Sequence, residues 1–370
     1  MIVNKKSNKT KIWTIVINCY NSTKTIIATL ESLDLQRNDI QVFVIDDGSK
    51  DNLKKCIKRF LDKYPDTIKY FRKANGNWGS CVNFAIKKCQ TRFMSILDSD
   101  DEYVTKSFNL VANLMKRINE DVDIIFTNHL LVSRQTNQVT KKYLSTTLKE
   151  IKYINLEKIK IFNFPTIHSV IFSTRLLKET KPLPSNIFYT DSILLYYVMQ
   201  KVNWIAFLNK NIFLYKYYIY RNDQSINIKT TLKNIRHLKC VYQVLLHNPT
   251  SKDASKKRIA ISAKMINYIF MWLIKTIAQD YRLSTKHKTA MVKYFATLLK
   301  NFIDKNPHYK DFSLSYTSYF LDKNPTVFVQ ILQTIVQSIR FGLVGATNFS
   351  KLERKAIKKY KKGLSETHIL

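Results

Sequence analysis

The stretch RFMSILDSDDEY, residues 92 to 103, runs from an apolar segment directly into an acidic cluster. Asp98, Asp100 and Asp101 stand within four positions, and Glu102 follows at once. Neighbouring carboxylates raise each other's proton affinity, so such a cluster is costly unless a cation or water screens it. Two interpretations are open at this point, a divalent metal site and a solvated turn. The surrounding sequence decides between them.

The segments before this cluster alternate between short apolar runs and amphipathic stretches. This pattern predicts buried strands and helices in turn: strands at 12–18, 40–47, 68–73 and 92–98, and helices at 22–33, 50–64 and 79–89, the first capped by Ser22. Such alternation indicates an α/β fold with a mainly parallel sheet that is covered by helices on both faces. Ligands of these sheets bind at the carboxyl ends of the strands.

Polar residues begin where three of these predicted strands stop. They are NCYN (18–21), DDGSKD (46–51) and DSDD (98–101). Each could be a simple turn, and DDGSKD also fits a turn followed by a helix cap. Because the carboxyl ends of parallel strands meet at one edge of a sheet, we expect the three segments to form a shared ligand site.

The alternation loosens after Tyr103. We predict a strand at 122–132, an extended stretch that becomes a helix over 164–179, a helix at 189–202 and aromatic, strand-like sequence from 204 to 226. Long helical patterns without strand signals begin near Lys229. The predicted domains are therefore residues 1–228 and residues 229–370.

Taken together, the segments VINCYNSTKTIIATLESL, VIDDGSKD, NGNWGSCVNFAI and MSILDSDDEY resemble the nucleotide-binding half of family 2 glycosyltransferases with the GT-A fold. The resemblance extends over residues 12 to about 225. It implies a nucleotide-diphospho-sugar transferase fold, Rossmann-like with a mainly parallel sheet, in residues 1–228. Residues 229–370 would then be a helical, basic region that contacts a membrane or the acceptor.

The resemblance also implies roles for residues at the strand ends. Asn18 and Tyr20 would pack on the nucleotide base, and Asp47 would hydrogen-bond its imide edge. Asn83, in the third motif, would contribute to donor binding. The frequent Ala-Arg of that motif is Cys81-Val82 here, so a basic contact is missing that Arg72 or Lys73 would have to replace.

The acidic cluster resembles the DxD element of the family. The resemblance implies that Asp98 and Asp100 contact the donor, the latter at its ribose, and that Asp101, together with Asp100, reaches a Mg²⁺ or Mn²⁺ bound to the diphosphate. Hard cations of this kind take oxygen ligands, few of them from protein when phosphates supply the rest. Of the two interpretations, the resemblance thus favours the divalent metal site, whose cation would neutralise the acidic cluster.

YTDSILLYY (189–197) resembles the later acidic motif of the family, with Thr190 in place of its Glu. Asp191 would be the catalytic base, because an acceptor hydroxyl needs a group that takes its proton. The alternative is that Asp191 only caps a helix. Arg221 and Ser225 of YRNDQSIN (220–227) would face the diphosphate or the acceptor, and His168 would either line the acceptor side or be structural.

The composition is strongly basic, with 61 Lys and Arg against 27 Asp and Glu. Such a charge favours anionic partners, although a lysine-rich coding bias is an alternative. The cysteines form no zinc-site spacing, the N-terminus has no signal-peptide pattern, and no window is long and apolar enough to span a membrane. We therefore expect a cytoplasmic protein.

Two C-terminal segments fit an anionic membrane surface on the inner face of the cell membrane. Residues 327–346 carry an apolar stripe at helical spacing, and KLERKAIKKYKK (351–362) holds seven basic residues and one acidic residue. A helix packed on its own domain is the alternative for the stripe.

The sequence thus predicts an inverting, metal-dependent, hexosyltransferase-like enzyme. It would move a sugar from a nucleotide-diphosphate sugar, a UDP-sugar by family analogy, to a glycan or lipid-linked hydroxyl acceptor in bacterial cell-surface polysaccharide, exopolysaccharide or teichoic-acid synthesis. Two alternatives remain, a nucleotidyltransferase and a basic nucleic-acid-binding protein. Against the first, this sequence lacks the Gly/Arg/Lys-rich phosphate loop that nucleotidyltransferases favour. We expect no nucleic-acid partner, because the acidic cluster would repel phosphates and no RNA-binding motif is present.

Overall fold

The structure is a computed structural model, which describes residues 11–159, 165–219 and 228–310. The chain separates into two compact units, residues 1–227 and residues 228–370. The division falls one residue before the predicted boundary, while the roles predicted for the two regions stay predictions.

The first unit is built on an eight-stranded sheet. Its strands follow the order β3 (Ile68–Arg72), β2 (Ile40–Asp46), β1 (Trp13–Cys19), β4 (Phe93–Asp98), β10 (Val170–Ser173), β6 (Ile124–Phe126), β11 (Trp204–Leu208) and β9 (Ile151–Asn155). The first four strands are mutually parallel, as predicted. Beyond them β10 runs antiparallel to both of its neighbours, and β9 runs antiparallel to β11. The sheet is therefore mixed, with its parallel half nearest the N-terminus.

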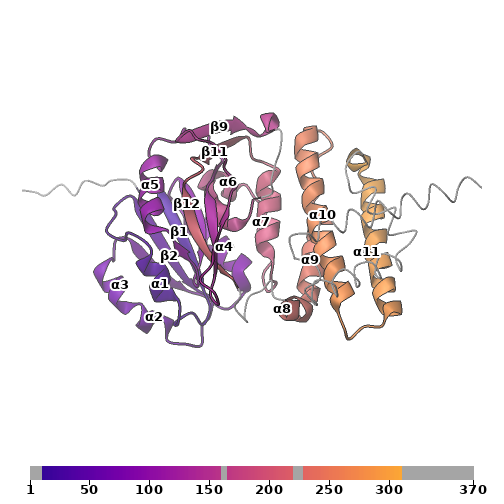
Figure 1. Ribbon diagram of the computed structural model, residues 1–370, viewed down its shortest axis with the longest axis horizontal. Helices are drawn as coiled ribbons and strands as arrows, with labels where there is room; N and C mark the ends of the chain where they lie inside the picture. Colours follow the sequence, from indigo (N-terminus) through magenta and orange to yellow (C-terminus); the bar gives the residue numbers. More distant parts are fainter. Residues whose placement is uncertain (1–10, 160–164, 220–227, 311–370) are drawn as a thin grey trace, which may run out of the picture. The chain divides into compact units, whose positions relative to one another are not determined.

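Helices cover both faces of this sheet (Figure 1). The helices of the unit are α1 (Ile26–Glu31), α2 (Leu53–Cys56), α3 (Lys58–Lys63), α4 (Asn77–Lys88), α5 (Thr105–Met115), α6 (Thr174–Lys178) and α7 (Thr190–Met199). Side chains of α1 and α5 share one core with β1 and β2. On the other face α4 packs against β1 and β2, and also against α6 and α7. The helix that follows the third strand thus links the parallel strands to the start of α7.

A second sheet has four strands in the order β5 (Glu102–Tyr103), β12 (Phe213–Ile219), β7 (Asn128–Ser133) and β8 (Val139–Lys142). The single strand predicted at 122–132 is wrong, because the chain leaves the large sheet at Thr127 and enters the small one at Asn128. The predictions also missed β8 and β9. Their residues are polar or alternate weakly, and tertiary pairing decides such strands.

Two of the predicted helices are shorter or divided. The helix at 22–33 begins at Ile26, after a turn in which the Ser22 carbonyl accepts the N–H groups of Thr25 and Ile26. The Ser22 hydroxyl accepts the Tyr20 N–H at 3.2 Å and lies 2.7 Å from Ser99 Oγ, and it accepts no N–H group of the helix, so the predicted cap at Ser22 is wrong. The helix at 50–64 is interrupted at Ile57 and appears as α2 and α3.

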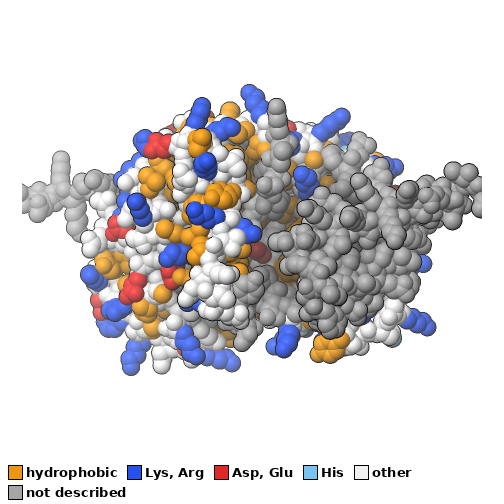
Figure 2. All heavy atoms as spheres, in the orientation of Figure 1, with side chains coloured by type: hydrophobic (Ala, Val, Ile, Leu, Met, Phe, Trp, Pro, Cys, Tyr) orange, Lys and Arg blue, Asp and Glu red, His pale blue; other side chains and the backbone are white. Residues whose placement is uncertain are grey.

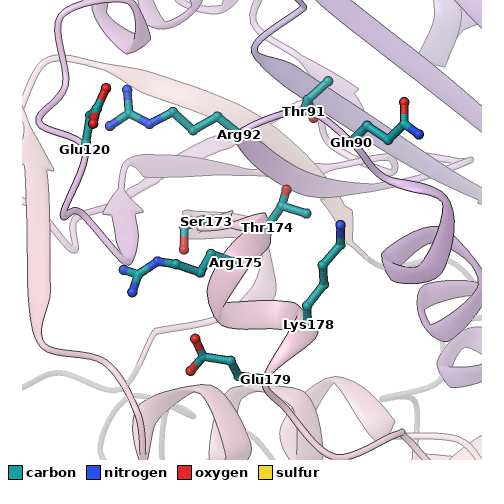
Figure 3. A pocket seen from close by; sticks show the side chains of 9 residues that line it. All are labelled: Gln90, Thr91, Arg92, Glu120, Ser173, Thr174, Arg175, Lys178 and Glu179. Atoms are coloured by element: carbon teal, nitrogen blue, oxygen red, sulfur yellow. The ribbon is translucent and has the colours of Figure 1, made fainter.

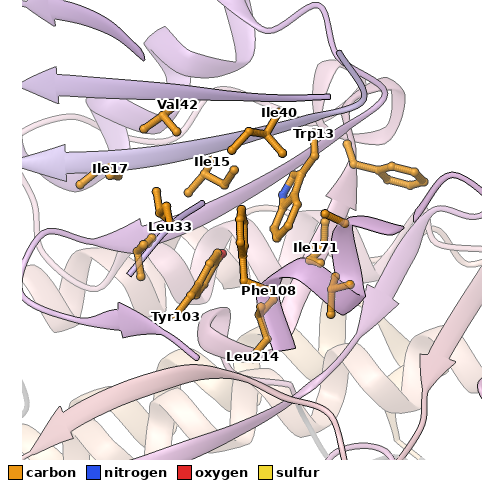
Figure 4. Packing of buried hydrophobic residues seen from close by; sticks show 14 of the residues in the cluster. Trp13, Ile15, Ile17, Leu33, Ile40, Val42, Tyr103, Phe108, Ile171 and Leu214 are labelled. Carbon is orange, nitrogen blue, oxygen red and sulfur yellow. The ribbon is translucent and has the colours of Figure 1, made fainter. Parts of the chain in front are cut away.

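The core of the first unit is organised around Trp13 (Figure 4). Its indole is fully buried against Tyr103 and Phe108, with ring centroids 5.9 and 5.1 Å away. The indole N–H donates to Ser95 Oγ at 2.8 Å, so the buried polar atom is satisfied. This packing fixes β1 and β4 side by side beneath the turns that carry the site.

The second unit is helical in its described part, as the sequence predicts. It contains α8 (Ile228–Lys233), α9 (Ile235–Leu246), α10 (Lys256–Gln279), α11 (Thr285–Lys305) and a 3₁₀ turn at Pro307–Tyr309. Tyr242 of α9 lies in its core, 5.6 Å from the ring of Phe270 and 6.1 Å from that of Phe295. Ser255 and Ser284 cap α10 and α11 through their hydroxyl oxygens.

On the described part of the face shown in Figure 2, basic side chains are more frequent than acidic ones. From residue 228 to residue 310 the sequence has 17 Lys and Arg against three Asp. Within the described ranges, none of the helices combines the length and the apolar character that crossing a membrane requires.

Candidate active site

The polar turns predicted to form a shared site lie side by side. In β1, Asn18 pairs in register with Asp98 of β4, and Cys19 pairs with Asp46 of β2. Hydrogen bonds join the turns themselves: Ser22 Oγ lies 2.7 Å from Ser99 Oγ. In the same way the Asn21 N–H donates to Ser49 Oγ at 3.0 Å. The three strand ends therefore form one continuous polar edge.

A pocket of about 390 Å³ opens at this edge. Three of the residues predicted to bind the donor line it, namely Asn18, Tyr20 and Asp47. The other lining residues are Cys19, Asn75, Asn77, Trp78, Cys81 and Phe188. Tyr20 is half exposed, at 48 %, so its aromatic ring is accessible to a flat ligand in the pocket.

Asp47 is 4 % exposed and its carboxylate organises the loop between β3 and α4. It accepts the backbone N–H of Gly76 at 3.0 Å and that of Asn77 at 2.8 Å, and it pairs with Lys73 Nζ at 2.6 Å. The following residue, Gly48, has φ +75° and lies so close to Asn75 that a side chain would be strained there. Asp47 thus shapes one wall of the pocket, whatever it contacts in a ligand.

Asn18 differs from its neighbours in hydrogen bonding. Both polar atoms of its side-chain amide are buried, and neither has a hydrogen-bond partner among the described residues. A buried amide without partners is costly, on the order of 1–3 kcal/mol for each unsatisfied group. Its position at the pocket is compatible with the predicted base contact.

Asn83, Arg72 and Lys73 are occupied elsewhere. The Asn83 amide donates to the Leu183 carbonyl at 2.8 Å and accepts the Leu183 N–H at 2.9 Å, and Asn83 does not line the pocket. Arg72 pairs with Asp46 at 3.0 Å, and Lys73 pairs with Asp47. These side chains therefore hold the scaffold of the site together.

The acidic turn brings Asp98 and Asp101 together with His168. One possible ligand atom from each of the three lies within 4.8 Å of the others. Asp101 is almost completely buried, and its carboxylate accepts hydrogen bonds from the Tyr215 hydroxyl at 3.0 Å and the Tyr218 N–H at 2.9 Å. Asp100, predicted to share the metal, is not part of this group.

His168 offers the kind of nitrogen that a metal ion binds. Burial, and after it the nearby His129, lower the pKa of His168 to about 3, so the imidazole is neutral at pH 7. Its Nε2 lies 4.0 Å from Asp98 Oδ2, and its buried Nδ1 has no hydrogen-bond partner in the described part of the chain. The ring is held by stacking on Tyr217, with centroids 4.2 Å apart. Two carboxylates and a neutral imidazole are a donor set that fits a divalent cation.

Asp191 lies in the first turn of α7, where the helix dipole favours a negative charge. Burial nevertheless raises the pKa of its carboxyl group, against the hydrogen bonds that it accepts from backbone N–H groups. Before it, Tyr189 adopts φ 67°, a left-handed conformation that is strained for a tyrosine. Such strain is common at sites where a side chain has to be aimed.

Thr190 is buried, and its hydroxyl has no hydrogen-bond partner among the residues that the structure describes. Of the other residues that the sequence singled out, Arg221 and Ser225 lie outside the described residues. The C-terminal segments at 327–346 and 351–362 lie outside them as well.

A larger depression, of about 680 Å³, lies at the opposite ends of the strands (Figure 3). It is lined by residues before β4 and around α6, including Arg92, Arg175 and Lys178. Arg92 donates to the Ile118 carbonyl at 2.9 Å, and Arg175 pairs with Asp123 at 2.8 Å, so two of its cations serve the scaffold. The smaller pocket, at the carboxyl ends, holds the candidate chemistry.

Sequence reasoning missed several residues of this site. Trp78 Nε1 donates to Asp98 at 3.3 Å, and the Tyr215 hydroxyl accepts the Asp98 N–H at 3.1 Å. Phe188 lines the pocket from the segment before α7. Trp78 lies within the segment NGNWGSCVNFAI but was given no role, and only the aromatic pattern of β12 hinted at Tyr215.

Comparisons with known proteins agree with this geometry. The model of the family described as Glycosyl transferase family 2 matches residues 14–180. An uncharacterized glycosyltransferase of Mycoplasma genitalium is 29 % identical over 208 residues, which are 54 % of this chain and 65 % of the relative. One of Mycoplasma pneumoniae is 37 % identical over 113 residues, which are 29 % of this chain and 38 % of the relative. The chain thus spans less than two thirds of the length of these curated relatives.

Among solved structures, S. aureus TarS (residues 1–349) is similar with a TM-score of 0.61 and 15 % sequence identity, over 90 % of this chain and 92 % of that one. The same protein in complex with UDP-GlcNAc is similar with a TM-score of 0.59 and 15 % identity, over the same shares of the two chains. At this identity the likeness concerns the fold, and it supports a GT-A architecture with C-terminal helices. The family model begins at β1 and ends just after α6, enclosing the polar turns of β1, β2 and β4, so residues 14–180 are a glycosyltransferase family 2 domain.

Proposed function

We propose that this protein is an inverting, metal-dependent glycosyltransferase that uses a nucleotide-diphosphate sugar. One observation carries the proposal: a pocket with an exposed aromatic ring lies at the carboxyl ends of β1 and β2, and the Asp98, Asp101 and His168 group lies at the end of the adjacent β4. The nucleobase of the donor would occupy the pocket, and its diphosphate would lie at the Asp98, Asp101 and His168 group. Family membership supports the same assignment.

Asp191 is the proposed catalytic base. Its carboxylate would take the proton of the acceptor hydroxyl while the hydroxyl oxygen forms a bond to the anomeric carbon. The bond from that carbon to the diphosphate breaks, and the electron pair leaves with the nucleoside diphosphate. Attack from the face opposite the leaving group inverts the configuration. Burial, which raises the pKa of Asp191, makes its carboxylate a stronger base than an exposed aspartate.

Asp98, Asp101 and His168 would hold the divalent cation. When bound, such a cation supplies Lewis-acid stabilisation of the negative charge on the diphosphate. An imidazole ligand suits Mn²⁺ better than Mg²⁺, which prefers a complete set of oxygen ligands. We therefore propose Mn²⁺ as the more effective ion. Asp100 would contact the ribose of the donor instead of the metal.

The proposed donor is a UDP-sugar. Support comes from S. aureus TarS, whose structures include complexes with UDP-GlcNAc and with UDP. Tyr20 and the buried amide of Asn18 would contact the base, Asp47 would shape its pocket, and Asp98 would contribute to donor binding. The proposed acceptor is a hydroxyl of a glycan or of a lipid-linked precursor of a cell-surface polymer.

The helical second unit is proposed to bring the enzyme to its acceptor at the inner face of the cell membrane. Its described part carries 17 basic and three acidic residues, and each basic side chain near an anionic bilayer contributes on the order of 1 kcal/mol. Full-length protein should sediment with anionic vesicles at physiological salt, and deletion of residues 327–370 should weaken this binding. Sedimentation that is equal for both proteins would contradict a role of the C-terminal segments.

The decisive experiment is hydrolysis of a panel of UDP-, GDP- and dTDP-sugars with and without Mn²⁺. We expect hydrolysis of at least one UDP-sugar that requires the metal and is lost in Asp101→Asn. The matched control is Asp62→Asn, which replaces an exposed carboxylate of α3 and should retain the activity. Release of pyrophosphate from a nucleoside triphosphate and a sugar phosphate would instead identify a nucleotidyltransferase.

A further inference from the structure

The segment that leads into α7 is fastened to the donor side of the site. The Asn83 amide of α4 makes hydrogen bonds of 2.8 and 2.9 Å with the carbonyl and the N–H of Leu183. The Asn186 N–H donates to the Gly76 carbonyl at 2.9 Å. Gly76 is the residue whose own N–H is held by Asp47. Hydrogen bonds therefore connect the pocket wall to the residues just before Asp191, the proposed catalytic base.

Gly79 brings the backbone of α4 against the same segment. A Cβ at this position would lie 2.8 Å from the Pro184 carbonyl oxygen and 2.9 Å from Thr190 Oγ1, closer than real Cβ atoms approach. Only glycine allows this contact without a shift of the backbone. The beginning of α7 is thus in direct contact with the helix that forms one wall of the pocket.

Phe188 stands at the end of this segment and lines the pocket. Its side chain is 37 % exposed, and Tyr20, on the same pocket, is 48 % exposed. Exposed aromatic rings combined with the amides of Asn75 and Asn77 suit a flat, polar heterocycle such as a nucleobase. Phe188 also lies between Asn186 and Tyr189, which both adopt positive φ angles, so its backbone is set by an unusual local conformation.

We propose that Phe188 contacts the base of the donor nucleotide and that an occupied pocket thereby fixes the start of α7, where Asp191 lies. This inference rests on the proposed function. In it, Asn83 is a positioning residue that acts through Leu183, which is a different role from the donor contact expected from the sequence. Binding of the donor nucleotide and positioning of the catalytic base Asp191 then depend on the same segment, residues 183–189.

The first test measures binding of UDP in the presence of Mn²⁺ by calorimetry. Phe188→Ala should weaken binding about tenfold, in the range that loss of one base–aromatic contact produces. Phe188→Tyr keeps a ring and should retain most of the affinity. Tyr143→Ala removes another half-exposed aromatic ring, which does not line the pocket, and should leave the affinity unchanged.

The second test follows amide hydrogen exchange of residues 183–190. UDP should slow exchange there by several-fold in the wild type, and this protection should be lost in Phe188→Ala at UDP concentrations that saturate the variant. Asn83→Ala should keep the UDP affinity but lose most of the protection and lower kcat more than it raises KM. A purely structural Phe188 would leave the protection intact.

The outcomes separate this inference from the proposed function. If the wild type binds none of UDP, GDP and dTDP, both are overturned. If the wild type binds UDP and Phe188→Ala binds it equally well, the inference on Phe188 is overturned and the proposed function stands. Equal melting temperatures of wild type and Phe188→Ala exclude unfolding as the cause of weaker binding.

Discussion

The two sides of the candidate site are built in different ways. On the donor side, the residues of the three polar segments lie at the ends of β1, β2 and β4 or in the turns that follow them, within the first 101 residues of the chain. The other side, called the base side here, consists of the candidate residues that come later in the chain: the proposed catalytic base Asp191 from a helix start, and His168 and Tyr215, which reach the acidic turn from a 3₁₀ turn and from a strand of the second sheet. Neighbouring parallel strands gather a site from contiguous motifs, whereas the mixed half gathers it from isolated residues.

The largest expected effect lies on the base side. Asp191→Asn keeps the shape and the capping ability of the side chain but cannot accept a proton. Transfer to the acceptor should fall about 10²-fold or more, while UDP affinity stays near the wild-type value. Near-normal turnover of this variant would show that Asp191 only caps the helix and is not the catalytic base.

The pH dependence of the same residue provides a second criterion. Burial raises the pKa of Asp191, so the active, ionised form should be reached only above the usual range of an aspartate. The acid limb of the rate profile should therefore lie higher than for an exposed carboxylate. A raised pKa in the folded state also means that ionisation opposes folding at neutral pH, so Asp191→Asn should melt at the same or a higher temperature. A lower melting temperature would indicate that the charge is stabilising.

An intermediate effect is expected where the two sides meet at the acidic turn. Asp101→Asn and His168→Ala should each weaken Mn²⁺ binding by about 10- to 100-fold or more. Asp100→Asn should leave Mn²⁺ affinity close to normal and weaken UDP binding instead. Calorimetry with Mn²⁺ alone and then with UDP distinguishes the two patterns. Loss of Mn²⁺ binding in Asp100→Asn would restore the ligand set that the sequence indicates.

A smaller effect concerns the contact between α4 and α7. Gly79→Ala places a methyl group against the Pro184 carbonyl, and such overpacking costs about 1–3 kcal/mol of unfolding free energy. Chemical denaturation measures this loss. Ala85→Gly in the same helix is a comparison that removes a buried methyl group without crowding the contact. If Gly79→Ala is neutral, α4 and α7 are not in tight contact.

The smallest effect is expected far from the site. Asp62→Asn breaks an ion pair between exposed side chains, Lys58 and Asp62 at i and i+4, and should change stability by less than about 0.5 kcal/mol. Activity should not change. This value sets the baseline against which the other variants are judged, and a larger loss would mean that surface charge contributes more to this basic chain than usual.

The parallel half could be predicted from sequence because its signals are local. β1, β2, β3 and β4 lie within one or two residues of their predicted bounds, and the polar residues that follow them are adjacent in the sheet. The match of residues 14–180 to glycosyltransferase family 2 also followed from these motifs. Helix ends were less predictable, as Ser22 and Ile57 illustrate, because turn hydrogen bonds compete with helix propensity.

The mixed half could be predicted only in part, since long-range pairing decides it. No local pattern shows that the chain changes sheets at Thr127, or that β12 delivers Tyr215 to Asp101, 114 residues earlier in the chain. The sequence left His168 open between an acceptor-side role and a structural role, and it did not indicate that His168 lies beside the acidic turn. The site assignments themselves, including Asp191 and the donor contacts, stay predictions that the variants above test.

The strand β8 has a consequence for the behaviour of the protein at high concentration. It forms the outer edge of the four-stranded sheet in the described part of the chain, and all four of its residues are exposed. An open edge of this kind can recruit a strand from another molecule and start aggregation. Lys141 and Lys142 lie on that edge, and burying their charges beside a second copy would be unfavourable. Replacing both by threonine should make the protein precipitate at lower concentrations without altering its catalytic chemistry.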